Sequence, residues 1–427
     1  MAKFGNHNKP RSGLIAALDI GTTKICCLIA RPASERSIYG ATGPSIIGIG
    51  HHVSAGIKAG NVVDLHKLEG SIRATVEAAE QMAGENIDKV FVNVSCGSPV
   101  SKIISREVEI AGHEIGEADL NRVHDPVHLL KDKPEEHTML HNIPVGYCID
   151  GNRGVREPVG MYGDNLGVNI HLITAKNGPI RNLETGIRRG HLEIEKMVFT
   201  PFASALSCLG DEEKRVGITC IDIGGGTTSY SMFFDGDLIH AGIIPLGGEN
   251  ITRDISHVLS MSFENAERLK NLKGSAVPST NDEHEIINYH QIGEEPGSEE
   301  NQVQRSMLVD IIKERVEEIM ELVDEHIEAS GFSKSVGRRV VLTGGSSQLP
   351  GITDAAARIL NKDVSLGRPI PVEGLAEAVS GAAFSTCVGL LQYAVKEYNE
   401  ADISALQTTG EPRGLIAKIG HWFRNNI

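Results

Sequence analysis

Apolar positions along the chain occur in short runs, and two of these runs end in the same polar scheme. Leu14 to Leu18 is a continuous apolar run, which is typical of a strand buried on both faces. The run ends at Asp19, a Gly-Thr-Thr turn follows at 21–23, and Ile25 to Ala30 is expected to be the returning strand. The pattern predicts a buried hairpin with an acidic residue at the end of its first strand.

A second copy of this pattern lies farther along the chain. A strand is expected over Val216 to Ile223, followed by a Gly-Gly-Gly-Thr-Thr turn at 224–228 and a returning strand from Ser229 to Phe234. Asp-Gly at 235–236 then predicts a hairpin turn into a further strand, Leu238 to Ile244. Two such units indicate an internal duplication, with two similar lobes facing each other.

Three stretches have the apolar spacing of amphipathic helices, and a strand follows the first of them. The helices are expected over Leu65 to Ala83, Ile180 to Gly190 and Ser306 to Ser330, and the strand over Val90 to Val94. One stripe of the longest helix is apolar and is predicted to pack into a core. It consists of Leu308, Ile311, Ile312, Ile319, Leu322, Val323 and Ile327.

Composition restricts the class of protein. The 427 residues, 40% apolar and 4% aromatic, indicate a soluble α/β protein with several cores. A formal net charge of −15 argues against a nucleic-acid binder, which needs a basic face. The seven cysteines form no CxxC pair and are expected to be core residues in a reducing cytosol. Residues 1–12 are expected to be a disordered tail, and neither a signal peptide nor a membrane-spanning run is apparent.

The two turns have the chemistry of a phosphate site. Glycines let backbone N–H groups approach a phosphate chain, and threonine hydroxyls add further donors. Asp19 and Asp222 stand at the two strand ends, where bare carboxylates would repel a polyphosphate. A divalent cation is therefore implied between them, and Mg²⁺ held through waters fits best. The GxxxxGK[ST] pattern of a Walker A loop is absent.

A third glycine turn, Thr343-Gly344-Gly345-Ser346, also follows an apolar run. Such a turn could hold an adenosine, because glycine permits close backbone approach. By spacing alone, an ordinary strand-to-helix loop is equally compatible with it.

Together these stretches resemble the FtsA family of bacterial cell-division proteins, within the actin and heat-shock-chaperone ATPase superfamily. The resemblance extends from about Leu14 to Ala394. Its stretches are "LDIGTTKICCLI", "HNIPVGYCIDG", "EPVGMYG", "VNIHLITAK", "CIDIGGGTTSYSMF", "IPLGGENITRDIS", "VVLTGGSSQLPGI" and "STCVGLLQYA". It implies an actin-like two-lobe α/β ATPase fold with duplicated ribonuclease-H-like lobes, a small inserted α+β subdomain and a C-terminal amphipathic helix.

The resemblance also implies roles for individual residues. The first phosphate loop is matched by Asp19, Gly21, Thr22, Thr23 and Lys24. The second is matched by Asp222, Gly224, Gly225, Gly226, Thr227 and Thr228. The turn near the ribose is Gly247 and Gly248, the adenine is flanked by Glu267 and Lys270, and the adenosine loop is Gly344, Gly345 and Ser346. The implied cofactors are ATP and Mg²⁺, with Asp19 and Asp222 near the metal.

The implied domain organisation divides the chain into several parts. The first lobe is expected over 13–94, 172–213 and 378–398, and the inserted subdomain over 95–171. The second lobe is expected over 214–250 and 331–377, with an outer subdomain at 251–330. Within the outer part, Lys273 to Gln304 is rich in Gly, Pro, Ser, Asn and Glu and is expected to be loop-rich. Residues 399–412 are expected to be a flexible linker before a membrane helix at 413–427.

Two positions depart from the family pattern. Chaperone-like relatives have a glutamate that orients the attacking water, and the corresponding position here is near Thr200. Because in-line attack needs an oriented water, we expect slow or negligible hydrolysis. The second departure is Gly293 to Gln304, where a shorter glycine-arginine turn is the family pattern.

The tail from Arg413 to Ile427 has the composition of an interfacial helix. If helical, it places Leu415, Ile416, Ile419, Trp422, Phe423 and Ile427 on one side, with Arg413, Lys418 and Arg424 flanking them. Such a segment fits the anionic inner face of a membrane, whereas the alternative is a helix docked on the protein itself. A single short anchor binds weakly, so many anchors on one polymer are needed for tight binding.

The leading functional hypothesis is an ATP-binding protein that polymerises on the cytoplasmic side of the inner membrane at the division septum. The resemblance implies that it tethers FtsZ through the FtsZ C-terminal peptide at the outer subdomain and recruits later divisome proteins through the inserted subdomain. A sugar-kinase-like phosphotransferase is the alternative, but no constellation for a catalytic base is evident. A chaperone-type ATPase would need a peptide-binding domain after residue 399, where only the linker and tail follow.

Overall fold

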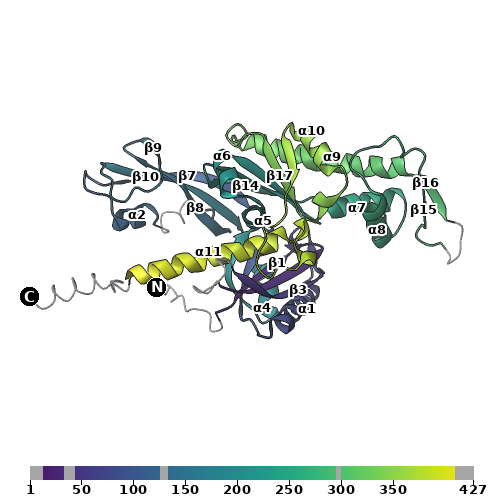
Figure 1. The fold of residues 1–427 in the computed structure, drawn as a ribbon, viewed down its shortest axis with the longest axis horizontal. Coiled ribbons are helices and arrows are strands. Elements are labelled where there is room, and N and C mark those ends of the chain that lie inside the picture. Colours follow the sequence, from purple (N-terminus) through teal and green to yellow (C-terminus); the bar gives the residue numbers. More distant parts are fainter. Residues whose placement is uncertain (1–12, 33–43, 126–132, 295–299, 409–427) are drawn as a thin grey trace, which may run out of the picture.

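Two five-stranded sheets of the same design form the body of the molecule (Figure 1). The computed structural model describes residues 13–32, 44–125, 133–294 and 300–408. The sheet orders are β3-β2-β1-β6-β11 and β14-β13-β12-β17-β18. In both, the central strand is antiparallel to its hairpin partner and parallel to the next strand, so the predicted duplication is confirmed.

The first lobe contains the first sheet and the helices around it. Its strands are β1 (Ile15–Ile20), β2 (Lys24–Arg31), β3 (Ser45–Val53), β6 (Lys89–Val94) and β11 (Glu193–Phe199), with a small β4 (Ile57–Lys58) and β5 (Asn61–Val62) pair. Its helices are α1 (Leu65–Ala83), α4 (Asn177–Arg189), α5 (Thr200–Cys208) and α11 (Ser385–Thr408). Helix α1 begins where Asp64 accepts backbone hydrogen bonds from His66 and Lys67, as expected for an N-cap.

The second lobe repeats the arrangement and carries an outer part. Its strands are β12 (Ile218–Ile223), β13 (Thr228–Phe234), β14 (Asp237–Ile244), β17 (Arg339–Thr343) and β18 (Asp363–Leu366). Its helical segments are α6 (Asp211–Val216), α7 (Gly248–Val258), α8 (Phe263–Lys273), α9 (Arg305–Ala329), α10 (Ile352–Leu360) and three short 3₁₀ turns, η1 (Gly345–Gln348), η2 (Glu377–Val379) and η3 (Ala382–Phe384). A hairpin of β15 (Ile286–Tyr289) and β16 (Asn301–Gln304) lies at one end of the molecule.

Helix α5 joins the two lobes, because it packs against α11 and β11 of the first lobe and against β12, β13 and β14 of the second. Helix α11 covers β1, β2 and β6 of the first sheet. Helix α9 packs against α7 and α10 in the second lobe, and its predicted apolar stripe is in the core. Leu308, Ile312 and Ile319 are fully buried, which confirms the interpretation of that helix.

A separate four-stranded sheet, β7-β10-β8-β9, lies at the opposite end from the β15–β16 hairpin (Figure 1). It is built from β7 (Val100–Glu109), β8 (His137–Ile149), β9 (Asn152–Val155) and β10 (Asn165–Lys176), with α2 (Glu117–Val123) packed on it. It has its own apolar core, which includes Ile110, Ile115 and Leu166.

Three sequence predictions need correction. The strand expected from Val216 begins at Ile218, because Val216 ends the short helix α6 and Gly217, with φ +106°, separates the two elements. Helix α11 continues through Thr408, so most of the expected linker at 399–412 is helical. The expected loop-rich segment contains the β15–β16 hairpin, so its last residues are a strand.

The two predicted terminal segments, 1–12 and 413–427, lie outside the described residues. Among the helices that the structure does describe, none is both long and apolar enough to span a bilayer.

Candidate functional site

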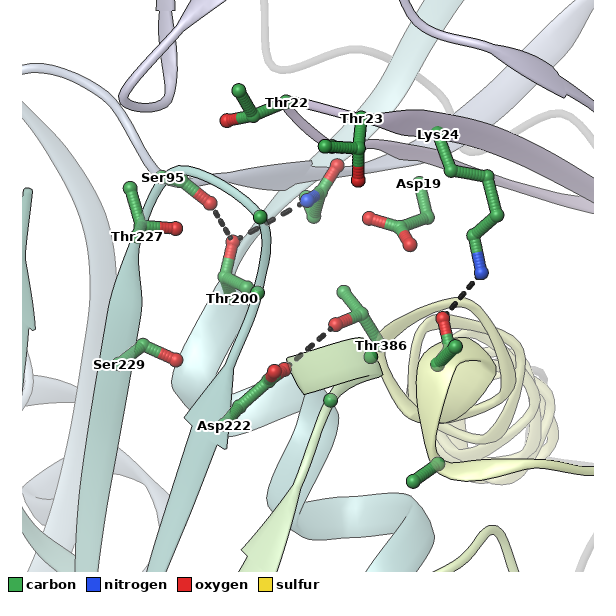
Figure 2. A pocket seen from close by; sticks show the side chains of 18 residues that line it. Asp19, Thr22, Thr23, Lys24, Ser95, Thr200, Asp222, Thr227, Ser229 and Thr386 are labelled. Atoms are coloured by element: carbon green, nitrogen blue, oxygen red, sulfur yellow. Dashed lines mark hydrogen bonds between the residues drawn. The ribbon is translucent and has the colours of Figure 1, made fainter. Parts of the chain in front are cut away.

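The two hairpins meet at a cavity between the lobes, and Figure 2 shows the side chains that line it. Asp19 and Lys24 come from the first lobe, Asp222 and Ser229 from the second, and Thr386 from the start of α11. The remaining lining residues are Gly21, Thr22, Thr23, Asn93, Ser95, Thr200, Gly224, Gly225, Thr227, Gly344, Gly345, Ala382 and Ala383. Most of the residues predicted for the two phosphate loops are therefore brought together.

The first hairpin contributes a buried acid and a lysine. Burial raises the pKa of Asp19 to about 7, with nearby Lys24 opposing this rise and Asp222 adding to it. The Lys24 ammonium donates to the Ala383 carbonyl and lies 3.3 Å from the centre of the Phe384 ring. A cation placed between the two acids would favour their ionised forms, because it would compensate the cost of burying them.

The second acid, Asp222, is held by two hydroxyl donors. Its Oδ2 accepts hydrogen bonds from Ser204 and, at 3.1 Å, from Thr386. Burial raises the pKa of Asp222, and the two hydrogen bonds and Lys24 partly offset the rise. The two hydrogen bonds thereby fix the orientation of this buried carboxylate at the end of β12.

Glycines at the site allow contacts that any larger residue would prevent. A Cβ at Gly225 would lie 2.4 Å from the Thr23 methyl, and one at Gly226 would lie 2.5 Å from the Thr22 hydroxyl oxygen. The tips of the two hairpins therefore approach each other closely. Gly344 has φ +89°, and a Cβ there would lie 2.2 Å from Asp222 Oδ1.

A second cavity of about 420 Å³ adjoins the first and shares Thr23, Gly225 and Gly345 with it. It is lined by the predicted Gly248, Glu267, Lys270 and Ser346, together with Glu249, Ile251, Asn271, Gln348, Leu349 and Pro350. The third turn is tied to the second hairpin, because the Ser346 hydroxyl donates to the Gly224 carbonyl over 3.0 Å.

The Glu267–Lys270 pair on α8 is held by α7. Lys270 Nζ donates to Glu267 Oε2 at 2.7 Å, to Thr252 Oγ1 at 2.8 Å and to the Gly248 carbonyl at 3.1 Å. Burial alone would raise the pKa of Glu267, but the hydrogen bonds that it accepts from Lys270 and Thr252, with the charge of Lys270, lower the pKa below its usual value. The pair is therefore a fixed polar wall of the second cavity.

Three predicted residues line neither cavity. Thr228 is fully buried, and its hydroxyl donates to the Leu246 carbonyl at 2.9 Å. Gly226 lies behind the hairpin tip against Thr22, and Gly247 packs on the carbonyls of Gly224 and Gly225. All three residues support the shape of the loops.

Several lining residues were not assigned from sequence. Asn93 is a polar residue in the otherwise apolar end of β6, and this break in the apolar pattern could have marked it as a site residue. Its Oδ1 accepts from the Ile20 backbone N–H at 2.7 Å, so it braces the end of β1. Thr386 lies in the quoted "STCVGLLQYA" stretch, and Ser229 directly follows the predicted second turn. Ser95 and the two alanines, Ala382 and Ala383, gave no distinctive pattern.

The residues fit a magnesium-bound nucleoside triphosphate. Donors, small residues and two buried acids line the inner cavity, and the adjoining one is large and polar. Within the described part of the chain, no group of three or more His, Cys, Asp or Glu side chains could hold a metal. A cation between Asp19 and Asp222 would therefore need waters and phosphate oxygens as its other ligands, as Mg²⁺ prefers.

Comparisons with known sequences identify the family of the chain. A family model described as "Cell division protein FtsA" matches residues 219–389, and one described as "SHS2 domain inserted in FTSA" matches 97–174. The FtsA of Agrobacterium fabrum is 43% identical over 98% of this chain and 96% of its own length. The FtsA of Rhizobium meliloti is 41% identical over 100% of both chains, and that of Escherichia coli K12 is 30% identical over 97% and 98%.

Solved structures confirm the actin-like fold. A structure named "PilM-PilN type IV pilus biogenesis complex" matches with a TM-score of 0.63 at 15% identity, over 89% of this chain and 98% of the other. MreB5 of Spiroplasma citri bound to ADP matches with a TM-score of 0.54 at 14% identity, over 92% and 99%. The near-full-length identity to three curated relatives, together with the inserted SHS2 domain, shows that this chain belongs to the FtsA family of cell-division proteins.

Proposed function

We propose that this chain is an ATP-binding, actin-like cell-division protein that assembles on the cytoplasmic face of the inner membrane at the septum. It would attach the FtsZ ring to that membrane and recruit later division proteins. The observation that carries the proposal is the meeting of two Asp-ended hairpins, one from each lobe, at one cavity. Family membership supplies the cellular context.

In this proposal the inner cavity holds the phosphates and the adjoining cavity holds the adenosine. Lys24 would neutralise phosphate charge, and the two acids would orient the hydration shell of Mg²⁺. The Glu267–Lys270 wall and the Gly345–Ser346 turn would flank the base and ribose. MreB5, whose fold is shared, has been solved with ADP and with AMPPNP, which supports the choice of an adenine nucleotide.

Hydrolysis should be slow, because the wall opposite the acids is neutral. The Thr200 hydroxyl shares a 2.7 Å hydrogen bond with Ser95 and accepts from Asn93 at 3.4 Å, so none of the three supplies a general base. Nucleotide would then act as a structural switch. Steady-state phosphate release by the full chain on lipid tests this, and turnover at kinase rates, roughly 1–100 per second, would contradict it.

The domain partition expected from the sequence belongs to the same proposal. The lobes at 13–94, 172–213 and 378–398 and at 214–250 and 331–377 would enclose the nucleotide, and 95–171 would contact later division proteins. The outer subdomain at 251–330 would receive the FtsZ C-terminal peptide. The tail at 413–427 would bind anionic lipid, and polymerisation would make that binding tight.

Exposed apolar residues on the outer subdomain support an FtsZ contact there. Leu272 is 68% exposed and Ile286 52% exposed. Arg305 connects the segments that carry them, since its Nε donates to the Lys273 carbonyl and its backbone N–H to the Glu285 carbonyl. Single exposed apolar residues are common on protein surfaces, but a group of them close together is more typical of a docking site.

Titration with a fluorescent FtsZ C-terminal peptide tests this contact. Leu272→Ser and Ile286→Ser should each weaken binding, roughly tenfold for a central contact. Val216→Ser, at a 73% exposed position in the second lobe, is the control and should have no effect. Equal affinities for all three variants would place the FtsZ contact elsewhere.

The decisive experiment for the function is electron microscopy on a lipid monolayer with magnesium and ATP. The full chain should form filaments on the lipid, and a chain ending at Pro412 should not. Filaments of the shortened chain on the lipid would rule out the tail as the anchor. Absence of filaments from both would argue against assembly.

A further inference from the structure

One residue of the inner cavity has an unexplained polar group. Ser229, on β13, is 2% exposed, and its hydroxyl has no hydrogen-bond partner among the described residues. Buried hydroxyls are almost always paired, and an unpaired one at a cavity wall points to a missing water or ion. In Figure 2 the Ser229 oxygen points into the cavity, toward the side where Asp222 lies.

The register of the sheet places this hydroxyl beside Asp222. Asp222 and Ser229 are directly paired across the β12–β13 ladder, so their side chains share one face. Cβ atoms of such a pair lie about 4.5–5.5 Å apart, a separation that one water can bridge. Because the hydroxyl oxygen is itself buried, its missing partner must be small, which favours a water molecule over a phosphate group.

The other lobe offers an internal comparison. Asp19 is paired across its own hairpin with Cys26, in the position that corresponds to Ser229. Cys26 is fully buried and lines neither cavity, and its backbone carbonyl accepts a hydrogen bond from the Cys387 thiol. The two copies therefore differ at this position of the hairpin: Ser229 lines the cavity next to Asp222, whereas Cys26 does not line it next to Asp19.

We propose that the Ser229 hydroxyl is a binding group of the nucleotide site, and that its oxygen accepts a hydrogen bond from a water of the magnesium hydration shell beside Asp222. This rests on the proposed function. The hydroxyl lies beside the carboxylate that Ser204 and Thr386 hold, and it positions the hydrated cation against the second lobe. Ser229 is therefore a positioning residue, which acts through water and makes no direct contact with phosphate.

Calorimetry with the ATP analogue AMPPNP, with magnesium and again with EDTA, tests the proposal on the full chain. Ser229→Ala should weaken binding roughly tenfold with magnesium, the value of one hydrogen bond to a charged assembly. With EDTA, its affinity should equal that of the unmodified protein. Ser229→Cys, which keeps the side-chain shape but has a sulfur that accepts hydrogen bonds only weakly, should show the same loss.

Ser231→Ala is the matched control. Ser231 lies two residues farther on β13, is fully buried, and also has an unpaired hydroxyl within the described structure, but it lines neither cavity. Neither alanine variant should lower the melting temperature of the ligand-free protein, because each removes an unsatisfied buried group. Only the Ser229 variants should change magnesium-dependent binding.

Each remaining outcome would overturn the proposal. If Ser229→Ala binds as tightly as Ser231→Ala, the hydroxyl is not a binding group. If its loss persists in EDTA, the hydroxyl contacts the nucleotide and not the hydrated cation. If the unmodified protein takes up no AMPPNP with magnesium, the proposed function fails and this inference fails with it.

Discussion

At the scale of residues, the candidate site depends on groups that are costly to bury and on glycines that bring them together. Asp19 and Asp222 are both buried, and burial raises both pKa values. Gly344 allows the third turn to pass beside Asp222, where a Cβ would lie 2.2 Å from the carboxylate oxygen. Such an arrangement is unfavourable without a ligand, which is characteristic of binding sites.

Gly344→Ala should therefore displace the Asp222 carboxylate and weaken magnesium–AMPPNP binding by at least about tenfold. Its positive φ and the collision should together cost roughly 1–3 kcal/mol of stability. Gly331→Ala is the control, because Gly331 also has positive φ, +76°, but has open space at the Cβ position. Binding by calorimetry and urea unfolding measure both effects, and equal binding by the two variants would show that the close approach at Gly344 is not required.

Much of this site could be predicted from local sequence, because strand ends and glycine turns are local signals. Asp19, Asp222 and the glycines of the turns are of this kind. Asn93 and Thr386 could not be placed, since they reach the cavity only through the parallel pairing of β1 with β6 and the docking of α11. Thr228 was assigned to the loop but faces the core, because alternation along β13 turns its side chain away.

At the scale of elements, the inserted sheet is joined to the second lobe by a partly buried polar contact. Ser101 on β7 shares hydrogen bonds with His171 on β10, at 2.6 Å, and with His240 on β14, at 3.1 Å. It also accepts from the Ala241 backbone N–H at 3.2 Å. An exposed pair, Arg156 with Asp235, adds a second connection, which contributes little because it is solvated.

Two histidines, His171 buried and His240 half-buried, make the stability of this junction depend on pH. Burial lowers the pKa of both His171 and His240 to about 4, so both are neutral in the folded protein at pH 5–7. The unfolded chain takes up protons below about pH 6.5, so the stabilising contribution is complete above that pH and is lost progressively toward pH 4. The free energy of unfolding should therefore fall as the pH is lowered through this window.

Urea unfolding at several pH values between 4.5 and 7.5 measures this slope. His171→Gln should reduce the slope, whatever its effect on stability at pH 7. His66→Gln, at an exposed position near the start of α1, should leave the slope unchanged. An identical slope in all three proteins would show that the junction does not titrate.

The boundaries of an element could be predicted where its periodic pattern is long. They could not be predicted where a tertiary contact decides them. Helix α9 agrees with its expected range to within one residue at each end. Helix α6 was missed because it is only six residues long and all but one of them are charged, so it has no apolar stripe. Its start is fixed by the Gly210 backbone N–H, which donates to the Glu213 carboxylate. The β15–β16 hairpin has a polar composition that gave no strand signal.

At the scale of the whole molecule, we propose that self-assembly links nucleotide binding in the cleft to membrane binding by the tail. The inserted sheet and the β15–β16 hairpin lie at opposite ends of the long axis, with the two lobes between them (Figure 1). We expect contacts at both ends to depend on the relative orientation of the two lobes. Nucleotide bound between the lobes would favour one orientation over others.

The tail gives a direct optical test, because Trp422 is the only tryptophan of the chain. Its fluorescence should shift to shorter wavelength with anionic vesicles and not with neutral ones, since Lys418 and Arg424 flank the apolar side. Lys418→Glu with Arg424→Glu should remove the shift and the cosedimentation. A shift of equal size with neutral vesicles would exclude the electrostatic part of the anchor.

The central claim is that the paired hairpins hold a magnesium-bound triphosphate between the lobes. A crystal structure with magnesium and AMPPNP tests it most directly. The account predicts phosphates in the inner cavity against Thr23, Lys24 and Gly225, Mg²⁺ between Asp19 and Asp222, and adenine beside Glu267 and Lys270. Nucleotide bound elsewhere, or a cleft that stays empty at saturating nucleotide, would contradict it.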